Sequence, residues 1–124
     1  MILGIGTDIV EPARLAEKLA RSPALRSKLF APAEIAYCEQ MADPAQHFAG
    51  RFAAKEALLK ALGFGLNGYL DLCDAAVENN ELGAPHFNFA GELKSIITER
   101  GVGRIHLSIT HIHLAASAIV ILEA

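Results

Sequence analysis

The sequence predicts a single α+β domain in which a largely antiparallel sheet packs around a long helix. The chain has 124 residues, about the length of one domain, and 52% of them are hydrophobic, which excludes a disordered chain. Helical and strand patterns follow one another without the regular β-α-β rhythm of a parallel sheet. We therefore expect residues 1–124 to fold around one core.

The first third of the chain predicts a strand and two helices. Residues 2–10 alternate apolar and small side chains, as a strand does, and Pro12 ends this pattern. Proline also suits the first turn of a helix, here over residues 12–21. A shorter helix is expected over residues 33–40, with Pro32 in its first turn.

The long helix at the centre of the chain has the clearest boundaries. Asp43 and Pro44 offer an N-cap and a first-turn proline. The helical pattern then continues through Leu62, and Gly63 is expected to end it.

The last part of the chain predicts four strands and one helix. Short strands are expected near residues 69–77 and 86–89, because turn-forming residues separate two apolar segments. A helix is expected over residues 91–100. Residues 104–111 and 114–122 read as two closing strands.

Charge and apolar patterning exclude several functions. Eleven Lys and Arg against fourteen Asp and Glu give a net charge of −3, which argues against binding nucleic acid through general electrostatics. The longest apolar run, residues 114–122, is far shorter than the roughly 20 residues that span a bilayer. The first residues lack a secretory signal pattern, so we expect a cytoplasmic protein. A small, apolar chain of this kind often forms an oligomer.

Asp8 is the first candidate for a functional site. Side chains alternate along a strand, so Gly4 and Gly6 share its face. Two positions without side chains allow a ligand or another backbone to approach closely, whereas an ordinary edge-strand aspartate needs only solvent. The opposite face carries Leu3, Ile5 and Ile9.

Charged residues also interrupt the apolar face of the long helix. Lys55 falls inside the apolar stripe and Glu56 on its border, and Lys60 lies one turn beyond Glu56. Charges in such places need partners, although a surface pair between Glu56 and Lys60 is the simpler alternative. The stripe itself consists of Phe48, Phe52, Leu59 and Leu62.

Asp8 and Glu56 together would suit Mg²⁺, which prefers oxygen ligands and bridges to substrate phosphates. Lys60 could then face a phosphate, and the glycine-rich loop that begins at Gly63 would permit close approach. This loop matches G-x-G-x-x-G only formally, because it follows a helix instead of joining a strand to a helix.

Two further features are open to a structural or a functional interpretation. Arg14, Lys18 and Arg21 share one face of the first helix, which is either a solvated face or a docking surface for an acidic protein. His111 continues the apolar face of its strand, and a histidine in such a place is usually structural.

Three segments together resemble a known family. They are GIGTDIVE at residues 4–11, FAGRFAAKEA at residues 48–57 followed by Lys60, and SITH at residues 108–111. The combination is similar to the holo-acyl-carrier-protein synthases, the small bacterial type of 4′-phosphopantetheinyl transferase. The resemblance implies that fold and the Mg²⁺-dependent transfer of 4′-phosphopantetheine from coenzyme A to a serine of apo acyl carrier protein, for fatty acid biosynthesis.

The resemblance also implies roles for residues. Asp8 and Glu56 match the metal-binding carboxylates, and Glu56 and Lys60 the catalytic residues. The serine proton would pass to Glu56 or to a metal-bound water. Contacts with coenzyme A are implied for Arg51, Lys60, Gly63, Gly65 and His111.

The resemblance further implies a homotrimer whose active sites lie between subunits, with the face of Arg14, Lys18 and Arg21 docking the acidic carrier protein. Some positions depart from the family pattern, among them Phe64, Ala84 and Ala115. Two rival functions stay open: a Mg²⁺-dependent nucleotide pyrophosphatase, which could use the same two carboxylates and lysine, and a non-catalytic module that binds carrier protein without them.

Overall fold

The computed structural model describes residues 1–64 and 71–124. The elements follow one another along the chain as β1 (Ile2–Val10), α1 (Pro12–Arg21), α2 (Pro23–Leu29), α3 (Pro32–Glu39), α4 (Pro44–Ala61), the 3₁₀ helix η1 (Leu72–Asp74), β2 (Ala75–Asn79), β3 (Pro85–Phe89), α5 (Gly91–Glu99), β4 (Arg104–His111) and β5 (Ala116–Glu123).

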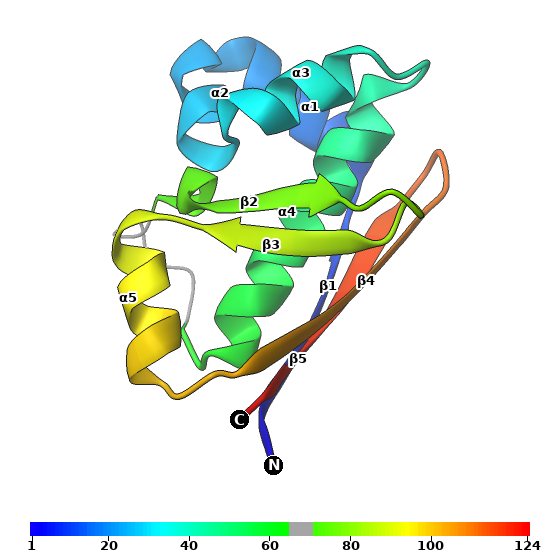
Figure 1. The fold of residues 1–124 in the computed structure, drawn as a ribbon. Coiled ribbons are helices and arrows are strands. Elements are labelled where there is room, and N and C mark those ends of the chain that lie inside the picture. Colours follow the sequence, from blue (N-terminus) through cyan, green and yellow to red (C-terminus); the bar gives the residue numbers. More distant parts are fainter. Residues whose placement is uncertain (65–70) are drawn as a thin grey trace.

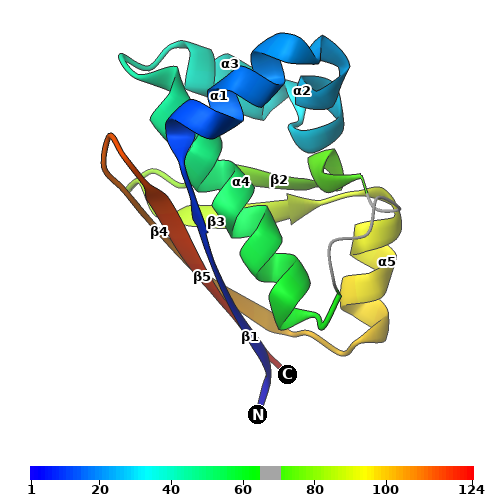
Figure 2. The same cartoon turned by 180° about the vertical axis from the view of Figure 1, so that it is seen from behind.

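The strands form two antiparallel sheets, which confirms the predicted α+β class. One sheet has the order β1-β5-β4, and the other is the β2–β3 hairpin. Helix α4 packs along the three-stranded sheet and also contacts α1, α3 and β2 (Figure 1). Seen from behind, α1, α2 and α3 gather at one end of α4, while α5 lies near its other end (Figure 2).

Two glycines of β1 let α4 come close to the sheet. A Cβ atom at Gly4 would collide with the carbonyl oxygen of Ala61, and one at Gly6 with the carbonyl oxygen of Ala57. The sequence allowed either a ligand or another backbone to approach this face, and the structure shows the backbone of α4 against it. The close packing brings Asp8, two residues further along β1, beside α4.

Helix α4 begins and ends close to the predicted positions, but its N-terminus is not capped as the sequence predicted. Asp43 occupies the N-cap, yet its side chain does not cap the helix and instead accepts a hydrogen bond from Gln46 Nε2 at 2.8 Å. At the other end Gly63 adopts a φ of +80°, and its N–H donates to the carbonyl of Lys60. A glycine is favoured in this left-handed conformation, so this prediction is confirmed.

Three elements differ from the sequence prediction. Helix α2 was not expected, because it has only seven residues and its apolar side chains that meet the core are just Leu25 and Leu29. The strand expected near residues 69–77 begins only at Ala75, after η1, and its first positions lie outside the described residues. The last strand begins at Ala116, since a hydrogen bond from Ile112 N–H to the Ala115 carbonyl closes a turn before it.

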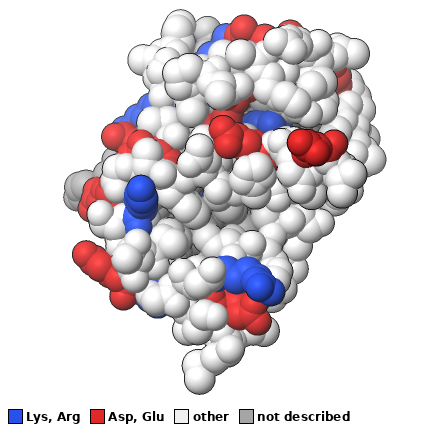
Figure 3. Space-filling model, viewed as in Figure 1, with Lys and Arg blue, Asp and Glu red and all other residues white. Residues whose placement is uncertain are grey.

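Charged side chains of both signs are scattered among uncharged ones on the face that carries β2 and β3 (Figure 3). The acidic side chains visible on this face therefore do not form one continuous patch. Within residues 1–64 and 71–124, no helix is both long enough and apolar enough to span a membrane.

Candidate active site

A groove of about 800 Å³ opens between α4 and the pair of helices α1 and α2. Asp8 and Glu56 both line it, together with Arg14 and Lys18 of α1. Its apolar wall is made by Val10, Leu15, Leu25, Leu29, Phe52, Leu59 and Leu72. The two carboxylates singled out in the sequence therefore open into one cavity.

Lys60 connects the two elements that carry these carboxylates. Its Nζ donates to Asp8 Oδ1 at 3.1 Å and to the Thr7 carbonyl oxygen at 3.0 Å. The pair is accessible, since 54% of the Lys60 side chain and 18% of the Asp8 side chain are exposed. The simpler expectation, a surface pair of Lys60 with Glu56, is not what the structure shows: the lysine bonds to Asp8.

Glu56 is a carboxylate held in an unfavourable environment. Its residue is only 7% exposed, and no hydrogen-bond donor reaches its side chain from the described part of the chain. Burial raises the pKa of Glu56, the negative charge of Asp8 raises it further, and the Lys60 charge opposes both effects.

This pair of carboxylates fits a divalent cation. A cation between Asp8 and Glu56 would relieve their repulsion and give the Glu56 oxygens a partner. The described residues hold no group of three or more His, Cys, Asp or Glu side chains that could bind a metal. Two protein ligands leave room for water and substrate phosphate, which is the coordination that Mg²⁺ favours.

Basic residues form the opposite side of the groove. Arg14 and Lys18 of α1 line it, and Lys28 of α2 joins them. Among the described residues, neither Arg14 nor Lys18 forms an ion pair. Arg21 is exposed at the last turn of α1 but does not line the groove.

A second, smaller hollow of about 180 Å³ contains other residues expected to bind coenzyme A. Arg51 Nη2 donates to Asn79 Oδ1 at 3.0 Å, and the guanidinium carbon lies 4.2 Å from the centre of the Tyr37 ring. Arg51 Nε is buried without a hydrogen-bond partner. The hollow is lined by Tyr37, His47, Gly50, Arg51, Asn79, Gly83, Pro85, Ile109 and His111.

Two histidines face each other in this hollow. The ring centres of His47 and His111 are 5.0 Å apart, and His111 Nδ1 lies 2.7 Å from Gln46 Oε1. Burial lowers the pKa of His47, and the charges of His111 and Arg51 lower it further. Because the lining includes these bases and no Asp or Glu, the hollow suits an anion.

Comparisons with known proteins identify the family. Residues 4–116 match the model of the 4′-phosphopantetheinyl transferase superfamily. The chain belongs to this superfamily. It is 43% identical to the holo-[acyl-carrier-protein] synthase of Syntrophus aciditrophicus, over 99% of this chain and 97% of that protein. It is 46% identical to the one of Clavibacter michiganensis, over 99% and 97% of the two chains.

Solved structures support the same family. The crystal structure of holo-[acyl-carrier-protein] synthase from Neisseria meningitidis matches with a TM-score of 0.89 and 33% identity, covering 100% of both chains. The Helicobacter pylori synthase in complex with coenzyme A matches with a TM-score of 0.83 and 29% identity, over 96% of this chain and 99% of that one.

In this member of the 4′-phosphopantetheinyl transferase superfamily, the residues expected to act together fall into two groups. Asp8, Glu56 and Lys60 lie at the groove, whereas Arg51 and His111 lie at the hollow, and the two cavities share no lining residue. Helix α4 contributes to both. Gly63 lies just beyond the end of α4, and Gly65 lies outside the described residues.

Sequence reasoning missed several residues of these cavities. His47 is four positions before Arg51 on α4, and this helical spacing was the available signal. Tyr37 and Asn79 come from α3 and β2, and only the tertiary fold brings them to Arg51.

Proposed function

We propose that this transferase moves 4′-phosphopantetheine from coenzyme A to a serine hydroxyl of apo acyl carrier protein, with Mg²⁺ held by Asp8 and Glu56. The observation that carries the proposal is the shared groove, in which two neighbouring carboxylates face a basic wall. The carboxylates suit a metal-bound pyrophosphate, and the basic wall suits an acidic protein substrate.

The reaction breaks a phosphoanhydride bond of the coenzyme A pyrophosphate and forms a phosphoester bond to serine. The serine oxygen attacks the phosphorus that carries the pantetheine arm and forms a new P–O bond. The bond from that phosphorus to the bridging oxygen breaks, and adenosine 3′,5′-bisphosphate leaves with the electron pair. The serine proton must be accepted by a base, and Glu56 is placed for the task because its carboxylate opens into the groove.

Each residue of the groove has a role in this proposal. When bound, Mg²⁺ would stabilise negative charge on the pyrophosphate. Lys60 would turn from Asp8 toward the pyrophosphate, which is feasible because its side chain is more than half exposed. Arg14 and Lys18, with Arg21 beyond them on the same helix, would attract and orient the acidic carrier protein.

The Arg51 hollow completes the proposed coenzyme A site from a neighbouring subunit. One molecule of coenzyme A would meet both Glu56 and His111 if the groove of one subunit faced the hollow of the next. The outer face of the three-stranded sheet supports an oligomer, because it exposes large apolar side chains that need cover. Their exposed fractions are 42% for Leu3, 63% for Ile5, 71% for Ile9 and 40% for Ile119. We propose a homotrimer.

Mixing two impaired variants tests this arrangement. Glu56→Ala damages the groove and His111→Ala damages the hollow, and neither residue is one of the exposed apolar side chains of the outer face. Random mixing of equal amounts should restore about a quarter of the sites, because half of the grooves and half of the hollows are intact. Sites contained within one subunit would give no recovery after subunit exchange.

The transfer assay tests the function itself. The protein is incubated with coenzyme A, Mg²⁺ and an apo carrier protein, and the carrier is analysed by mass spectrometry. A serine-linked gain of phosphopantetheine is expected. Hydrolysis of coenzyme A without a carrier would favour a pyrophosphatase, and carrier binding without turnover a non-catalytic module. The proposal locates the reaction in the cytoplasm, where the holo carrier would serve fatty acid biosynthesis.

A further inference from the structure

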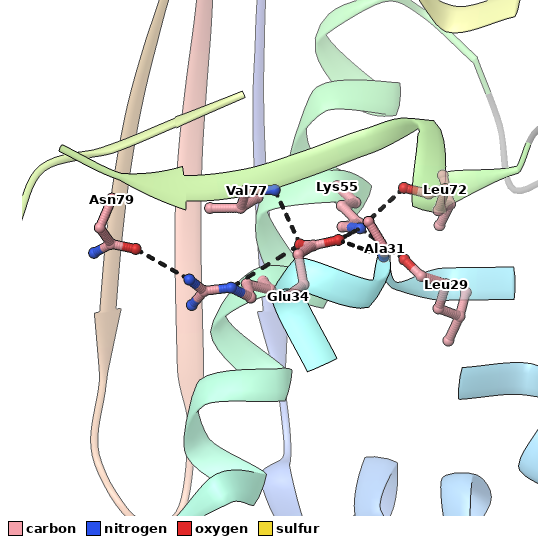
Figure 4. Close-up of polar contacts among 8 residues, drawn as sticks. Leu29, Ala31, Glu34, Lys55, Leu72, Val77 and Asn79 are labelled. Atoms are coloured by element: carbon pink, nitrogen blue, oxygen red, sulfur yellow. Dashed lines mark hydrogen bonds and ion pairs between the residues drawn. The ribbon is translucent and has the colours of Figure 1, made fainter. Parts of the chain in front are cut away.

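Lys55 is a fully buried cation whose three donors are all used. Its residue is 0% exposed, and Nζ donates to Glu34 Oε1 at 2.6 Å, to the Leu29 carbonyl at 2.6 Å and to the Leu72 carbonyl at 2.9 Å (Figure 4). An ammonium group has three N–H bonds, so its hydrogen-bonding capacity is filled. Removing such a charge from water is costly, and an apolar residue of similar size would often serve stability as well.

The acceptors of Lys55 lie in the wall of the catalytic groove. Leu29 is the last residue of α2 and Leu72 the first of η1, and both line the groove. Lys55 immediately precedes Glu56 on α4. It therefore joins two segments of the groove wall to the helical turn that carries the proposed metal ligand.

Glu34 holds this lysine in place. The carboxylate is 1% exposed, and besides Lys55 it accepts hydrogen bonds from the Ala31 and Val77 N–H groups, both at 2.9 Å (Figure 4). Glu34 thus links α3 to β2 as well as to α4. Every one of these contacts is inside the protein, so the cluster is not itself a substrate site.

This anchor also fixes the end of helix α2. None of its residues from Pro23 to Leu29 is fully buried, and Leu25 and Leu29 are the half-buried side chains that pack against the core. The chain is fixed just beyond it, where the buried Phe30 ring lies 5.1 Å from Lys55 Nζ. The position of Leu29 in the groove wall is consequently set where α2 meets Lys55.

We propose that Lys55, held by Glu34, is a positioning residue of the transfer reaction. It fixes the groove wall formed by Leu29 and Leu72 relative to Glu56, and so sets where the pantetheine arm and the carrier serine lie. This inference rests on the proposed function. Small errors in the placement of reacting groups cause large losses of rate, so loss of the anchor should affect turnover.

The test is the double variant Lys55→Met/Glu34→Gln, which removes both charges of the buried pair; Arg51, whose Nε lies 4.0 Å from Glu34 Oε2, loses a distant ion-pair partner in this variant. We expect kcat with saturating substrates to fall about tenfold or more and the KM for carrier protein to rise, whereas the KM for coenzyme A reports the separate loss of the Glu34 partner of Arg51. The matched control is Glu39→Gln, which breaks the exposed Arg26–Glu39 bond between α2 and α3 and should leave all three constants unchanged.

A purely structural role would lower the stability of the double variant and leave its kinetic constants unchanged at temperatures where it is folded, and this result would overturn the inference. If the double variant does not fold, Glu34→Gln alone is measured. We expect the same changes in the kinetic constants, but smaller ones. Kinetic constants equal to those of wild type would overturn the inference. The wild-type assay separates this failure from failure of the proposed function, because wild type must transfer phosphopantetheine in either case.

Discussion

Two lysines five positions apart on α4 show how differently one helix can use the same charge. Lys55 pairs with Glu34 where both side chains are 0% exposed, whereas Lys60 pairs with Asp8 where the exposed fractions are 54% and 18%. The buried lysine has three fixed acceptors and cannot turn elsewhere. The exposed lysine can exchange its partner for a ligand, which is what a binding site requires.

The carboxylates beside these lysines differ in the same way. Glu34 accepts hydrogen bonds from two backbone N–H groups and from Lys55. Glu56 receives none from the described residues, and its pKa is raised by burial and by Asp8. Around α4, therefore, the carboxylate that accepts several hydrogen bonds belongs to the structural pair, and the carboxylate that accepts none from the described residues opens into the groove.

The largest expected effect comes from the functional carboxylates. Replacing Asp8 or Glu56 by Ala should reduce kcat/KM for transfer by about 10³-fold or more, because each change removes a ligand of the proposed Mg²⁺. The fold should persist, since both side chains open into the groove. The measurement is the transfer assay with Mg²⁺ limiting.

Glu17→Ala is the matched control for these variants, since it removes an exposed carboxylate from α1 and should leave the rate unchanged. Near-normal turnover of Asp8→Ala or Glu56→Ala would refute the metal assignment.

The second prediction contrasts the two lysines in stability. Lys55→Met leaves the buried Glu34 with only the more distant Arg51, 4.0 Å away, as an ion-pair partner and should lower the free energy of unfolding by about 3 kcal/mol. Lys60→Met breaks an exposed pair and should lower it by at most about 1 kcal/mol. Urea denaturation of both variants measures the difference, and equal losses would show that burial does not separate the two pairs.

The third prediction concerns Arg14, a cation of the groove that pairs with no carboxylate among the described residues. Arg14 lines the groove and forms no ion pair with the described residues, so it is free to meet a carrier protein. Arg14→Glu should raise the KM for carrier about tenfold at low salt and leave the KM for coenzyme A nearly unchanged. Charge reversal at the exposed Arg104 is the control, and equal loss of affinity for both substrates would contradict docking at α1.

The sequence predicted the functional pair better than the structural one. Alternation along β1 placed Asp8 beside two glycines, and helical spacing placed Glu56 and Lys60 on one side of α4, because both patterns are local. The need of Lys55 for a partner was also visible. Its partner was not, since Glu34 lies 21 residues earlier and the contact depends on how α3 packs against α4.

The division of the site into two cavities was beyond local patterns for the same reason. Arg51 and Glu56 are five residues apart, yet they open into different cavities because α4 is surrounded by the sheet on one side and by α1, α3 and β2 on others. Helix α2 was missed because it is short and none of its residues is fully buried, so the Ser22–Pro23 start was not followed by a clear apolar face.

The smallest expected effect concerns the pH dependence of stability that His47, a partly buried base on α4, contributes. In the unfolded chain His47 titrates near its ordinary pKa of 6.5, whereas burial and the nearby His111 and Arg51 lower its pKa in the fold. Below pH 6.5 the unfolded chain therefore binds a proton that the folded chain resists, so stability should fall as the pH falls from that value toward the lower folded pKa.

His47→Phe should flatten this part of the profile when unfolding free energies are measured in urea between pH 7.5 and pH 5.5. His86→Gln, on the exposed side of β3, should keep the wild-type slope, because it leaves His47 and its neighbours His111 and Arg51 unchanged. If His47→Phe lost as much stability as wild type over this range, burial beside Arg51 would not disfavour the protonated histidine.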